Sequence, residues 1–542
     1  MSHSDAKLHR LLMDRSDTDP YALAYDSVRY GALAARAARV AGSLREAGVR
    51  WGDSVAVALD GGVEYLVAFY GTLMAGATVV PLSPEVRGAD LVRILDHCGA
   101  TALVAAGPVL DRLTGHGSLP PRLRAALHVG APQRLLPAVL DSLDFAVAEN
   151  SGRELFDTGA QGSALACVSY TSGTTGAPKG VMLSHDNVVS NVRSIIEYLD
   201  LTPRDRVAMV LPHHSVYGGS VLHTHLAVGG SIVDAGSATS PVRVLETIGD
   251  EGCTGLSGVP STFASLLRVD DLERFDLSTL RYLTHAGGAM SPTLTRRVRA
   301  AFPGADLFVM YGQTEAGARL SYLPPEDVDG KLGSVGVPIP GVSLSVVDLS
   351  GRPVSPGEVG EIVASGANVM VGYLGEPAAT ERTLRGGVLH TGDMGYIDPD
   401  GYIYISGRSN DMISSGGYKV GPQEVENVIT ALPGVADCAV VGVADELLGE
   451  RIVAVLALEE GEHLDPRFVQ RACQAALPRH KVPSEVRFVT ELPYSERGKL
   501  SRSAVRTLLE GGSGGTTPLA VPSRQSKSVA PITNEARPAA PN

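Results

Sequence analysis

Short apolar segments alternate with amphipathic segments through much of this chain, and this alternation most constrains its fold. The amphipathic segments include 30–48 and 290–302, and the apolar ones, each near such a segment, are 54–59, 101–106, 206–211, 229–234 and 305–312. Strands that alternate with helices usually form parallel sheets with helices on both faces. The sequence therefore predicts an α/β fold in which a large N-terminal domain holds two layered α/β subdomains.

The pattern changes from about residue 340, where closely spaced strands are punctuated by Gly and Pro and predict a small antiparallel β subdomain. After Arg408 a compact α+β pattern follows. The last residues are rich in Gly, Ser, Pro and Ala, which bury too little surface to offset the entropy of ordering. We predict an N-terminal domain over 1–410, a small mobile α+β C-terminal domain over 411–510 and a disordered tail over 511–542.

Composition narrows the class of partner. The chain has 542 residues and a net charge of −13, from 46 basic and 59 acidic residues, with no basic run longer than a pair. This argues against nucleic acid and anionic membranes and favours small molecules or other proteins. Five scattered cysteines lack metal-binding spacing and are expected to be reduced core thiols. Gly71, Gly76 and Pro81 interrupt the most apolar stretch, and the N-terminus has no signal-like run, so we expect a cytoplasmic protein.

The segment YTSGTTGAPKG at 170–180 follows a predicted strand and combines glycines, hydroxyls and Lys179. Glycines allow the backbone to approach a polyphosphate closely, while amides, hydroxyls and the lysine supply donors and charge. The spacing differs from the Walker pattern because Gly180, not Ser or Thr, follows the lysine. A surface turn is the alternative. Ser184 or Asp186 can begin the next helix.

Five motifs in order resemble those of the acyl-adenylate-forming ligases, which include acyl-CoA synthetases, peptide-synthetase adenylation domains and luciferases. They are YTSGTTGAPKG, YGQTE at 311–315, HTGDMGYIDPDGYIYISGRSND at 390–411, SGGYKVGPQEVE at 415–426 and PYSERGKLSR at 493–502. The resemblance extends from about residue 25 to 508. It implies that a carboxylic acid and ATP form an acyl-AMP and pyrophosphate, and that a nucleophile, usually a thiol, then displaces AMP.

The resemblance also implies the nucleotide site. The Tyr311 ring offers a face to adenine, Asp393 suits the two ribose hydroxyls, and Glu315 with Thr175 suits Mg²⁺. A surface carboxylate and an ordinary turn are the alternatives for Glu315 and Asp393. The full set expected at the nucleotide is Thr171, Ser172, Gly173, Thr174, Thr175, Gly176, Lys179, Gly288, Ala289, Tyr311, Gly312, Gln313, Thr314, Asp393, Arg408 and Lys499.

Catalysis is expected from Lys499, Lys179 and Thr175. A carboxylate and a phosphate repel each other, so an ammonium that touches both stabilises the transition state. By resemblance Lys499 has this role, although a solvated lysine is the alternative, and the small domain rotates about a hinge at Asp411. The glycines of GGYKVG at 416–421 are expected to line a tunnel for the thiol.

The expected acyl pocket is made by His214, Ser215, Tyr217, Gly218, Gly287 and Gly312. Many members of the family have a histidine where this chain has Ser215, and often a lysine shortly after the hinge aspartate, where this chain offers Ser414 and Ser415. This stretch has no aspartate to hold an α-ammonium, which argues against a free amino acid. A medium-sized or cyclic acid fits better than a long chain. The histidines at 213, 214, 223 and 225 are expected to pack rather than bind metal.

Three functions follow in order of preference. The first is an acyl-CoA ligase that uses ATP, Mg²⁺ and CoA. The second is an adenylating ligase that transfers the acyl group to a carrier-protein thiol or to an amine. The third, a non-catalytic nucleotide-binding protein, conflicts with the presence of Lys179, Glu315, Asp393, Arg408 and Lys499 together. The sequence leaves the acid and the oligomeric state open.

Overall fold

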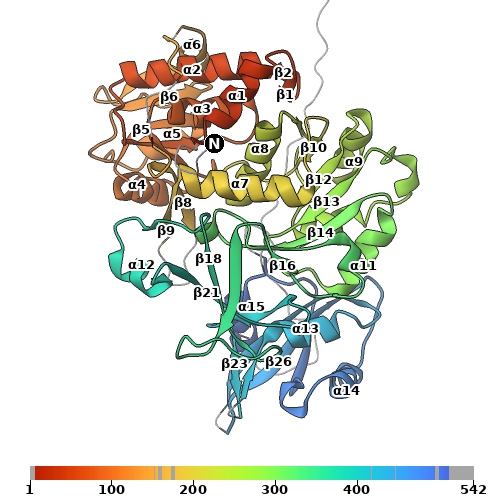
Figure 1. Ribbon diagram of the computed structural model, residues 1–542. Coiled ribbons are helices and arrows are strands. Elements are labelled where there is room, and N and C mark those ends of the chain that lie inside the picture. The colour runs from red at the N-terminus through yellow and green to blue at the C-terminus, as the bar shows by residue number, and fades with distance from the viewer. Residues whose placement is uncertain are drawn as a thin grey trace, which may run out of the picture.

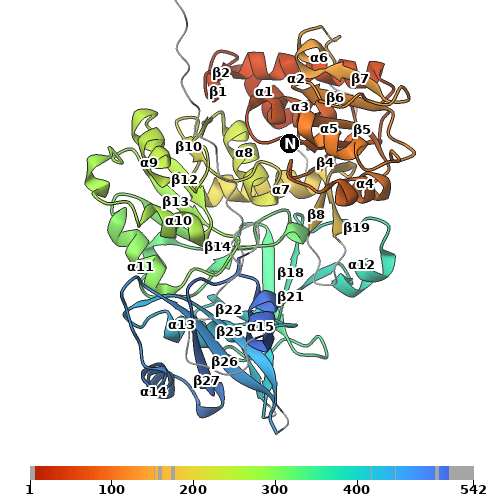
Figure 2. The same cartoon turned by 180° about the vertical axis from the view of Figure 1, so that it is seen from behind.

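The computed structural model describes residues 7–151, 153–156, 161–171, 178–416, 418–445, 447–494 and 500–511. Four sheets organise these residues (Figure 1), and Figure 2 shows the same arrangement from behind. Two large α/β sheets lie side by side, a small antiparallel sheet lies next to both, and the fourth sheet belongs to the C-terminal part of the chain. The predicted α/β class, with a large N-terminal part and a small C-terminal α+β part, is confirmed.

The first sheet has eight strands and is parallel from β8 through β7. Both of its faces are buried, since Val55 and Val57 of β3 join one core with α2 and α3, and Ala56 and Ala58 join another with α4 and α5. Its strands in spatial order are β19 (Gly372–Tyr373), β9 (Lys179–Ser184), β8 (Leu165–Thr171), β4 (Thr78–Pro81), β3 (Ser54–Ala58), β5 (Ala100–Ala106), β6 (Ala125–Val129) and β7 (Asp141–Asp144). The helices are α2 (Tyr30–Glu46), α3 (Val63–Met74), α4 (Gly88–His97), α5 (Gly107–Thr114) and α6 (Phe145–Ser151).

The second sheet has nine strands with a parallel centre from β14 through β1. In order they are β16 (Val337–Pro338), β15 (Ser321–Leu323), β14 (Asp306–Tyr311), β13 (Tyr282–His285), β12 (Gly255–Gly258), β10 (Arg206–Met209), β11 (Ser231–Asp234), β1 (Leu23–Tyr25) and β2 (Val28–Arg29). One face packs on α7, the other on the helices that follow α8. The helices are α1 (Arg10–Thr18), α7 (His185–Leu199), α8 (Val216–Val228), α9 (Pro241–Asp250), α10 (Pro260–Leu266) and α11 (Pro292–Ala301).

Local sequence signals fix several of these boundaries. The Ser184 hydroxyl accepts a hydrogen bond from the Asn187 amide, and the Asn187 side chain accepts one from the Ser184 amide. This capping box starts α7 at Ser184, one of the two predicted starting residues. The apolar stretch 63–82 divides into α3 and β4, as its glycines and proline predict. No described helix is long and apolar enough to cross a membrane.

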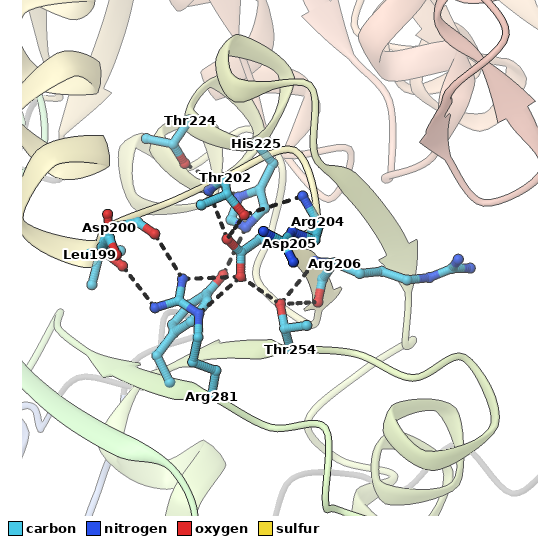
Figure 3. A network of polar contacts seen from close by, with 11 residues as sticks. Leu199, Asp200, Thr202, Arg204, Asp205, Arg206, Thr224, His225, Thr254 and Arg281 are labelled. Atoms are coloured by element: carbon cyan, nitrogen blue, oxygen red, sulfur yellow. Dashed lines mark hydrogen bonds and ion pairs between the residues drawn. The ribbon is translucent and has the colours of Figure 1, made fainter.

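A buried carboxylate ties together the amino ends of three parallel strands (Figure 3). Asp205, just before β10, accepts hydrogen bonds from Thr202, from Thr254 before β12 and from Arg281 before β13. Although burial opposes the charged form, these donors hold the pKa of Asp205 below its ordinary value. The network fixes one edge of the second sheet and leaves the opposite, carboxyl edge to the loops that form the candidate site.

The remaining sheets confirm the change of pattern near residue 340. The third is antiparallel and contains β17 (Val342–Val347), β18 (Gly360–Gly366), β20 (Leu384–Arg385), β21 (Val388–Ile397) and β22 (Ile403–Arg408), with α12 (Pro377–Thr383) beside it. The fourth contains β23 (Ile413–Ser415), β24 (Tyr418–Val420), β25 (Val435–Asp445), β26 (Gly449–Leu458) and β27 (Glu485–Val489), packed on α13 (Pro422–Ile429), α14 (Pro466–Ala476) and α15 (Arg502–Gly511).

The fourth sheet has cores of its own, which supports a separate C-terminal domain. The boundaries at residues 410 and 510 stay predictions. Most of the predicted tail, 512–542, lies outside the described residues. All five cysteines are buried and free of disulfides, as expected of core thiols.

Candidate active site

The predicted phosphate loop joins two antiparallel strands. Thr171 ends β8 and Lys179 begins β9, and the two residues are cross-strand partners. The two strands form an antiparallel β-hairpin, whereas a Walker loop leads from a strand into a helix. The predicted loop residues Ser172, Gly173, Thr174, Thr175 and Gly176 lie outside the described residues.

Lys179, Tyr373 and Glu315 meet beside this hairpin. Tyr373 belongs to β19, which pairs with β9, and its ring centroid lies 5.0 Å from the Lys179 Nζ. The Tyr373 hydroxyl donates to the Glu315 Oε1 at 2.8 Å. Burial, together with the Glu315 carboxylate, raises the pKa of Tyr373, so its hydroxyl keeps its proton. The tyrosine thus links the predicted phosphate lysine to the predicted magnesium ligand.

Sequence reasoning missed Tyr373. Its strand has only two residues, so it carries no alternating pattern. The one signal in the sequence was an aromatic residue within the run MVGYLG, which has no charged residue that suggests a site.

Asp393, Arg408 and Tyr311 form a second cluster. Asp393 and Arg408 are cross-strand partners in β21 and β22, and the Arg408 Nε lies 2.7 Å from the Asp393 Oδ1. The Tyr311 hydroxyl donates to the other carboxylate oxygen at 2.6 Å. Burial and Asp393 raise the pKa of Tyr311 well above its ordinary value. The structure therefore joins three residues predicted at adenine and ribose, and their contacts with the nucleotide stay predictions.

The loops after β13 and β14 provide a surface suited to a flat ligand. Gly287, Gly288 and Ala289 are all exposed, and Gly287 has a φ of +85°, which favours glycine. Gly312 also has to be glycine, because a Cβ there would lie 2.0 Å from the Ala318 carbonyl oxygen. The next residue, Gln313, has a buried Nε2 without a hydrogen-bond partner. A purine nucleotide offers the acceptors that such an orphaned donor needs.

Thr314 and Glu315 follow in the short 3-10 helix η2 (Thr314–Ala316). Among the described residues, no group of three or more His, Cys, Asp or Glu residues can hold a metal ion by itself. A Mg²⁺ at Glu315 would therefore take its other ligands from phosphate oxygens and water, which is the usual arrangement for this ion in nucleotide sites.

The predicted acyl-pocket residues do not all line one cavity. His214 and Ser215 line a narrow cavity between α3, α7 and α8 that Tyr65, Phe69 and Val188 also line. Tyr217 is not among the residues that line it and lies against the second sheet, where its hydroxyl donates to the Thr284 carbonyl at 2.9 Å. Gly218, Gly287 and Gly312 do not line this cavity either.

Ser215 has a structural role that its position in the motif did not indicate. It is the N-cap of α8, its hydroxyl accepting from the Gly218 amide at 2.9 Å and donating to the Pro212 carbonyl at 2.7 Å. Gly218 must be glycine, since a Cβ there would lie 2.2 Å from that same carbonyl oxygen. Both hydrogen bonds of Ser215 are therefore used within the helix start.

Three of the four nearby histidines pack as predicted, while His214 lines the cavity. His213 contacts the Tyr25 hydroxyl at 3.0 Å, His223 the Tyr70 hydroxyl at 2.9 Å, and His225 the Tyr282 hydroxyl at 2.8 Å. Burial lowers the pKa of His213 and of His225 to about 4, and that of His223 to about 3. These three imidazoles are neutral polar parts of the core.

Lys499 lies outside the described residues, but both ends of its segment are placed. Tyr494 and Leu500 form an antiparallel bridge. At the start of α15, one guanidinium nitrogen of Arg502, Nη2, donates to both oxygens of the buried Glu426 carboxylate, at 2.6 and 2.7 Å. The segment is thus anchored on the C-terminal domain.

The predicted hinge residue Asp411 follows the third sheet. Its amide donates to the Arg408 carbonyl at 2.9 Å, and its carboxylate lies 3.8 Å from the Arg506 guanidinium of α15. Of the GGYKVG tunnel segment, Gly417 lies outside the described residues, and Tyr418 is exposed and stacks on His480. The hinge and tunnel roles stay predictions.

Known proteins share both the sequence pattern and the fold. A feruloyl-CoA synthase from Amycolatopsis is 35% identical over 89% of this chain and 94% of its own length. The anthranilate CoA ligase AuaEII in complex with anthranoyl-AMP matches with a TM-score of 0.85 and 26% identity over 93% of this chain and 97% of its own. The amide bond synthetase McbA from Marinactinospora thermotolerans matches with a TM-score of 0.83 and 28% identity, over 92% and 99% respectively.

Family models agree with these similarities. The model of the AMP-binding enzyme matches residues 14–374, which hold the phosphate hairpin and the YGQTE motif. The model of the AMP-binding enzyme C-terminal domain matches residues 424–499, which end at the predicted catalytic lysine. The chain belongs to the family of AMP-binding, acyl-adenylate-forming ligases.

Proposed function

We propose that this protein is an acyl-CoA ligase that activates a medium-sized or cyclic carboxylic acid with ATP and transfers the acyl group to CoA. The observation that carries the proposal is the linkage of Lys179, Tyr373 and Glu315, because it joins a cation for phosphate to a hard oxygen ligand for a metal. The family and its CoA-ligase relatives support the same reaction.

The first half-reaction forms a bond between a substrate carboxylate oxygen and the α-phosphorus and breaks the bond from that phosphorus to the pyrophosphate oxygen. Both reactants are anions, so the barrier falls when fixed positive charges surround them. Lys179 at the hairpin supplies one such charge. Lys499 and Thr175 complete the proposed catalytic set.

Magnesium supplies charge neutralisation to the pyrophosphate leaving group when it is bound. Glu315 and Thr175 are the proposed protein ligands. The Tyr373 hydroxyl holds one Glu315 oxygen and leaves the other for the metal side. Asp393 and Arg408 are proposed to hold the ribose, and Tyr311 to face the adenine.

In the second half-reaction the CoA thiolate attacks the acyl carbonyl carbon, and the bond from that carbon to the phosphate oxygen breaks to release AMP. We propose that rotation at Asp411 carries Lys499 away and brings the 416–421 segment to the site. Similarity to feruloyl-CoA synthase and anthranilate CoA ligase supports both a cyclic acid and CoA.

Transfer to an amine or to a carrier-protein thiol is the second candidate. The similarity to the amide bond synthetase McbA favours the amine, and so does Ser215, which replaces the histidine that many family members have at this position. The adenylation step is common to both candidates, so only the acceptor distinguishes them.

The test is pyrophosphate exchange into ATP across a panel of aryl, cyclic and linear acids, followed by product analysis with CoA, amines and a carrier protein as acceptors. We expect acid-dependent exchange with Mg²⁺ and a thioester with CoA. An amide product would select the second candidate. Nucleotide binding without exchange for any acid would contradict the proposal and favour a non-catalytic protein.

A further inference from the structure

Arg319 is a buried arginine close to the candidate acyl pocket. Its side chain is only 2% exposed, and its guanidinium lies over the Tyr217 ring, 4.1 Å from the centroid. Its Nε contacts the Met310 sulfur at 3.3 Å. Within the described part of the chain, no Asp or Glu carboxylate forms an ion pair with Arg319.

The backbone that presents Arg319 is strained and clamped. Ala318, immediately before it, has a φ of +127°, a conformation that residues other than glycine rarely adopt. The side-chain amides of Asn191 and Asn368 donate to the Arg319 carbonyl oxygen at 2.9 and 3.0 Å. Strain of this kind persists only where surrounding contacts hold it, and it is commonly found at ligand sites.

Arg281 offers an internal comparison in the same sheet. Its guanidinium also lies over a tyrosine, 4.9 Å from the Tyr282 centroid, but it pairs with the buried Asp205 carboxylate at 3.0 Å. Figure 3 shows this pair at the amino edge of the strands. Arg281 is thus compensated within the protein. Arg319 is more deeply buried, and among the described residues its side chain has the Tyr217 face, the Met310 thioether and the Tyr198 hydroxyl but no carboxylate.

A buried guanidinium without a counter-charge is unfavourable, and a cation–π contact offsets only part of that penalty. A ligand anion would compensate it fully, because the planar guanidinium binds carboxylate or sulfonate oxygens through two parallel hydrogen bonds.

Arg319 is also placed next to the substrate wall. Tyr217, which it covers, follows Ser215 of the cavity by two residues. Gly317 and Asn191 line that cavity, and Asn191 holds the Arg319 carbonyl. Tyr217 itself is immobilised by its bond to Thr284, whose hydroxyl donates to Ser257 at 2.8 Å. Neither Arg319 nor Tyr217 lines the cavity itself, so the stacked pair lies next to it, held in place against the second sheet.

This inference rests on the proposed function. We propose that the acid activated here carries a second anionic oxygen group, a carboxylate or sulfonate, and that Arg319 binds this group in the acyl pocket. The second group takes no part in the chemistry and determines which acid is selected.

The experiment compares matched acids in pyrophosphate exchange. The pairs are α,ω-dicarboxylates with linear monocarboxylates of equal length, and isophthalate or terephthalate with benzoate. We expect the wild type to favour the acid with two carboxylates over the acid with one in at least one pair, by about 10-fold in kcat/KM. Arg319→Met should lower kcat/KM for the dicarboxylate by roughly 100-fold, whereas kcat/KM for the monocarboxylate should be unchanged or higher. Arg319→Lys should keep part of the preference.

Arg281→Met is the matched control, since it removes a stacked arginine that already has a partner. It should lower the melting temperature and change both acids of a pair by the same factor. The inference is overturned if the wild type prefers no acid that has a second carboxylate. It is also overturned if Arg319→Met changes kcat/KM equally for both members of a pair. Exchange with monocarboxylates alone would refute this inference and would not contradict the proposed function. No exchange with any acid would contradict both.

Discussion

The Tyr373 hydroxyl donates a 2.8 Å hydrogen bond to Glu315 while the Tyr373 ring lies beneath the Lys179 ammonium. The tyrosine is a short edge strand's only large side chain, yet it positions groups from two distant motifs. Its orientation depends on the pairing of β19 with β9 and on the turn after β14. The contact holds the proposed magnesium ligand, Glu315, close to the proposed phosphate-binding lysine, Lys179.

Tyr373→Phe tests this role. The variant keeps the ring beneath Lys179 and loses the bond to Glu315, which contributes about 1 kcal/mol. We expect acyl-AMP formation to fall by roughly 5- to 10-fold, with a higher Mg²⁺ concentration needed for half-maximal exchange. Tyr404→Phe, which removes a hydroxyl from a tyrosine stacked on Tyr396, is the control. An unchanged Mg²⁺ dependence would show that Tyr373 does not position Glu315.

Lys499→Ala tests the proposed catalytic lysine. We expect adenylate formation to fall by about 100-fold, which corresponds to roughly 3 kcal/mol of transition-state stabilisation. Transfer from a pre-made acyl-adenylate to CoA should stay within about 2-fold of the wild type, because the lysine is proposed to act only in the first half-reaction. Single-turnover assays of each half-reaction provide the measurement, and equal losses in both would refute domain alternation.

Glu426→Gln tests the anchor of the lysine segment. The substitution keeps the shape of the side chain and removes the negative charge that pairs with Arg502. Loss of one partner of a buried pair is expected to cost about 3 kcal/mol of C-terminal domain stability. We expect adenylate formation to fall more than thioester formation. Glu424→Gln is the matched control on the same helix, since Glu424 pairs with Lys481 instead. A uniform loss in both half-reactions would mean that the anchor only supports folding.

Ser215→Ala tests whether Ser215 acts only as the N-cap of α8 or takes part in the chemistry. Loss of an N-cap hydroxyl usually costs about 1 kcal/mol. We therefore expect a lower melting temperature and a change in kcat of less than about 3-fold. Asp465→Ala, which removes the cap of α14 far from the pocket, should lower stability similarly. A drop in kcat of about 100-fold with unchanged stability would assign Ser215 to the chemistry.

His223→Asn tests the buried histidine core. Burial lowers the pKa of His223 to about 3 from its ordinary 6.5, so between these values the unfolded chain binds a proton that the folded chain does not. Stability is therefore complete above pH 6.5 and declines as the pH falls, by up to about 1.4 kcal/mol per pH unit for this one group. The Asn side chain retains a partner for Tyr70 and cannot titrate. In urea unfolding between pH 7 and 4.5, the free energy of unfolding of the variant should fall less steeply with decreasing pH than that of the wild type, by the equivalent of one proton.

Local chemistry allowed the sequence by itself to determine the elements and the identity of the motifs. Short apolar runs predicted β3 and β5, the glycines and proline of 63–82 predicted a helix followed by a strand, and Ser184 was one of two residues predicted to start α7. Each of these signals acts over a few residues, through backbone geometry or a single hydrogen bond. The motif residues Lys179, Glu315 and Asp393 were recognisable because their types and spacing are themselves the signal.

Only the tertiary structure decided which residues support them. Tyr373 reaches Glu315 across a strand pairing, Arg502 reaches Glu426 across the C-terminal core, and Arg319 is left without a carboxylate although Arg281 has one. Such contacts join residues that are far apart in the chain. Their formation depends on the packing of whole sheets, and no periodicity or short motif encodes which charge ends with a partner and which remains for a ligand.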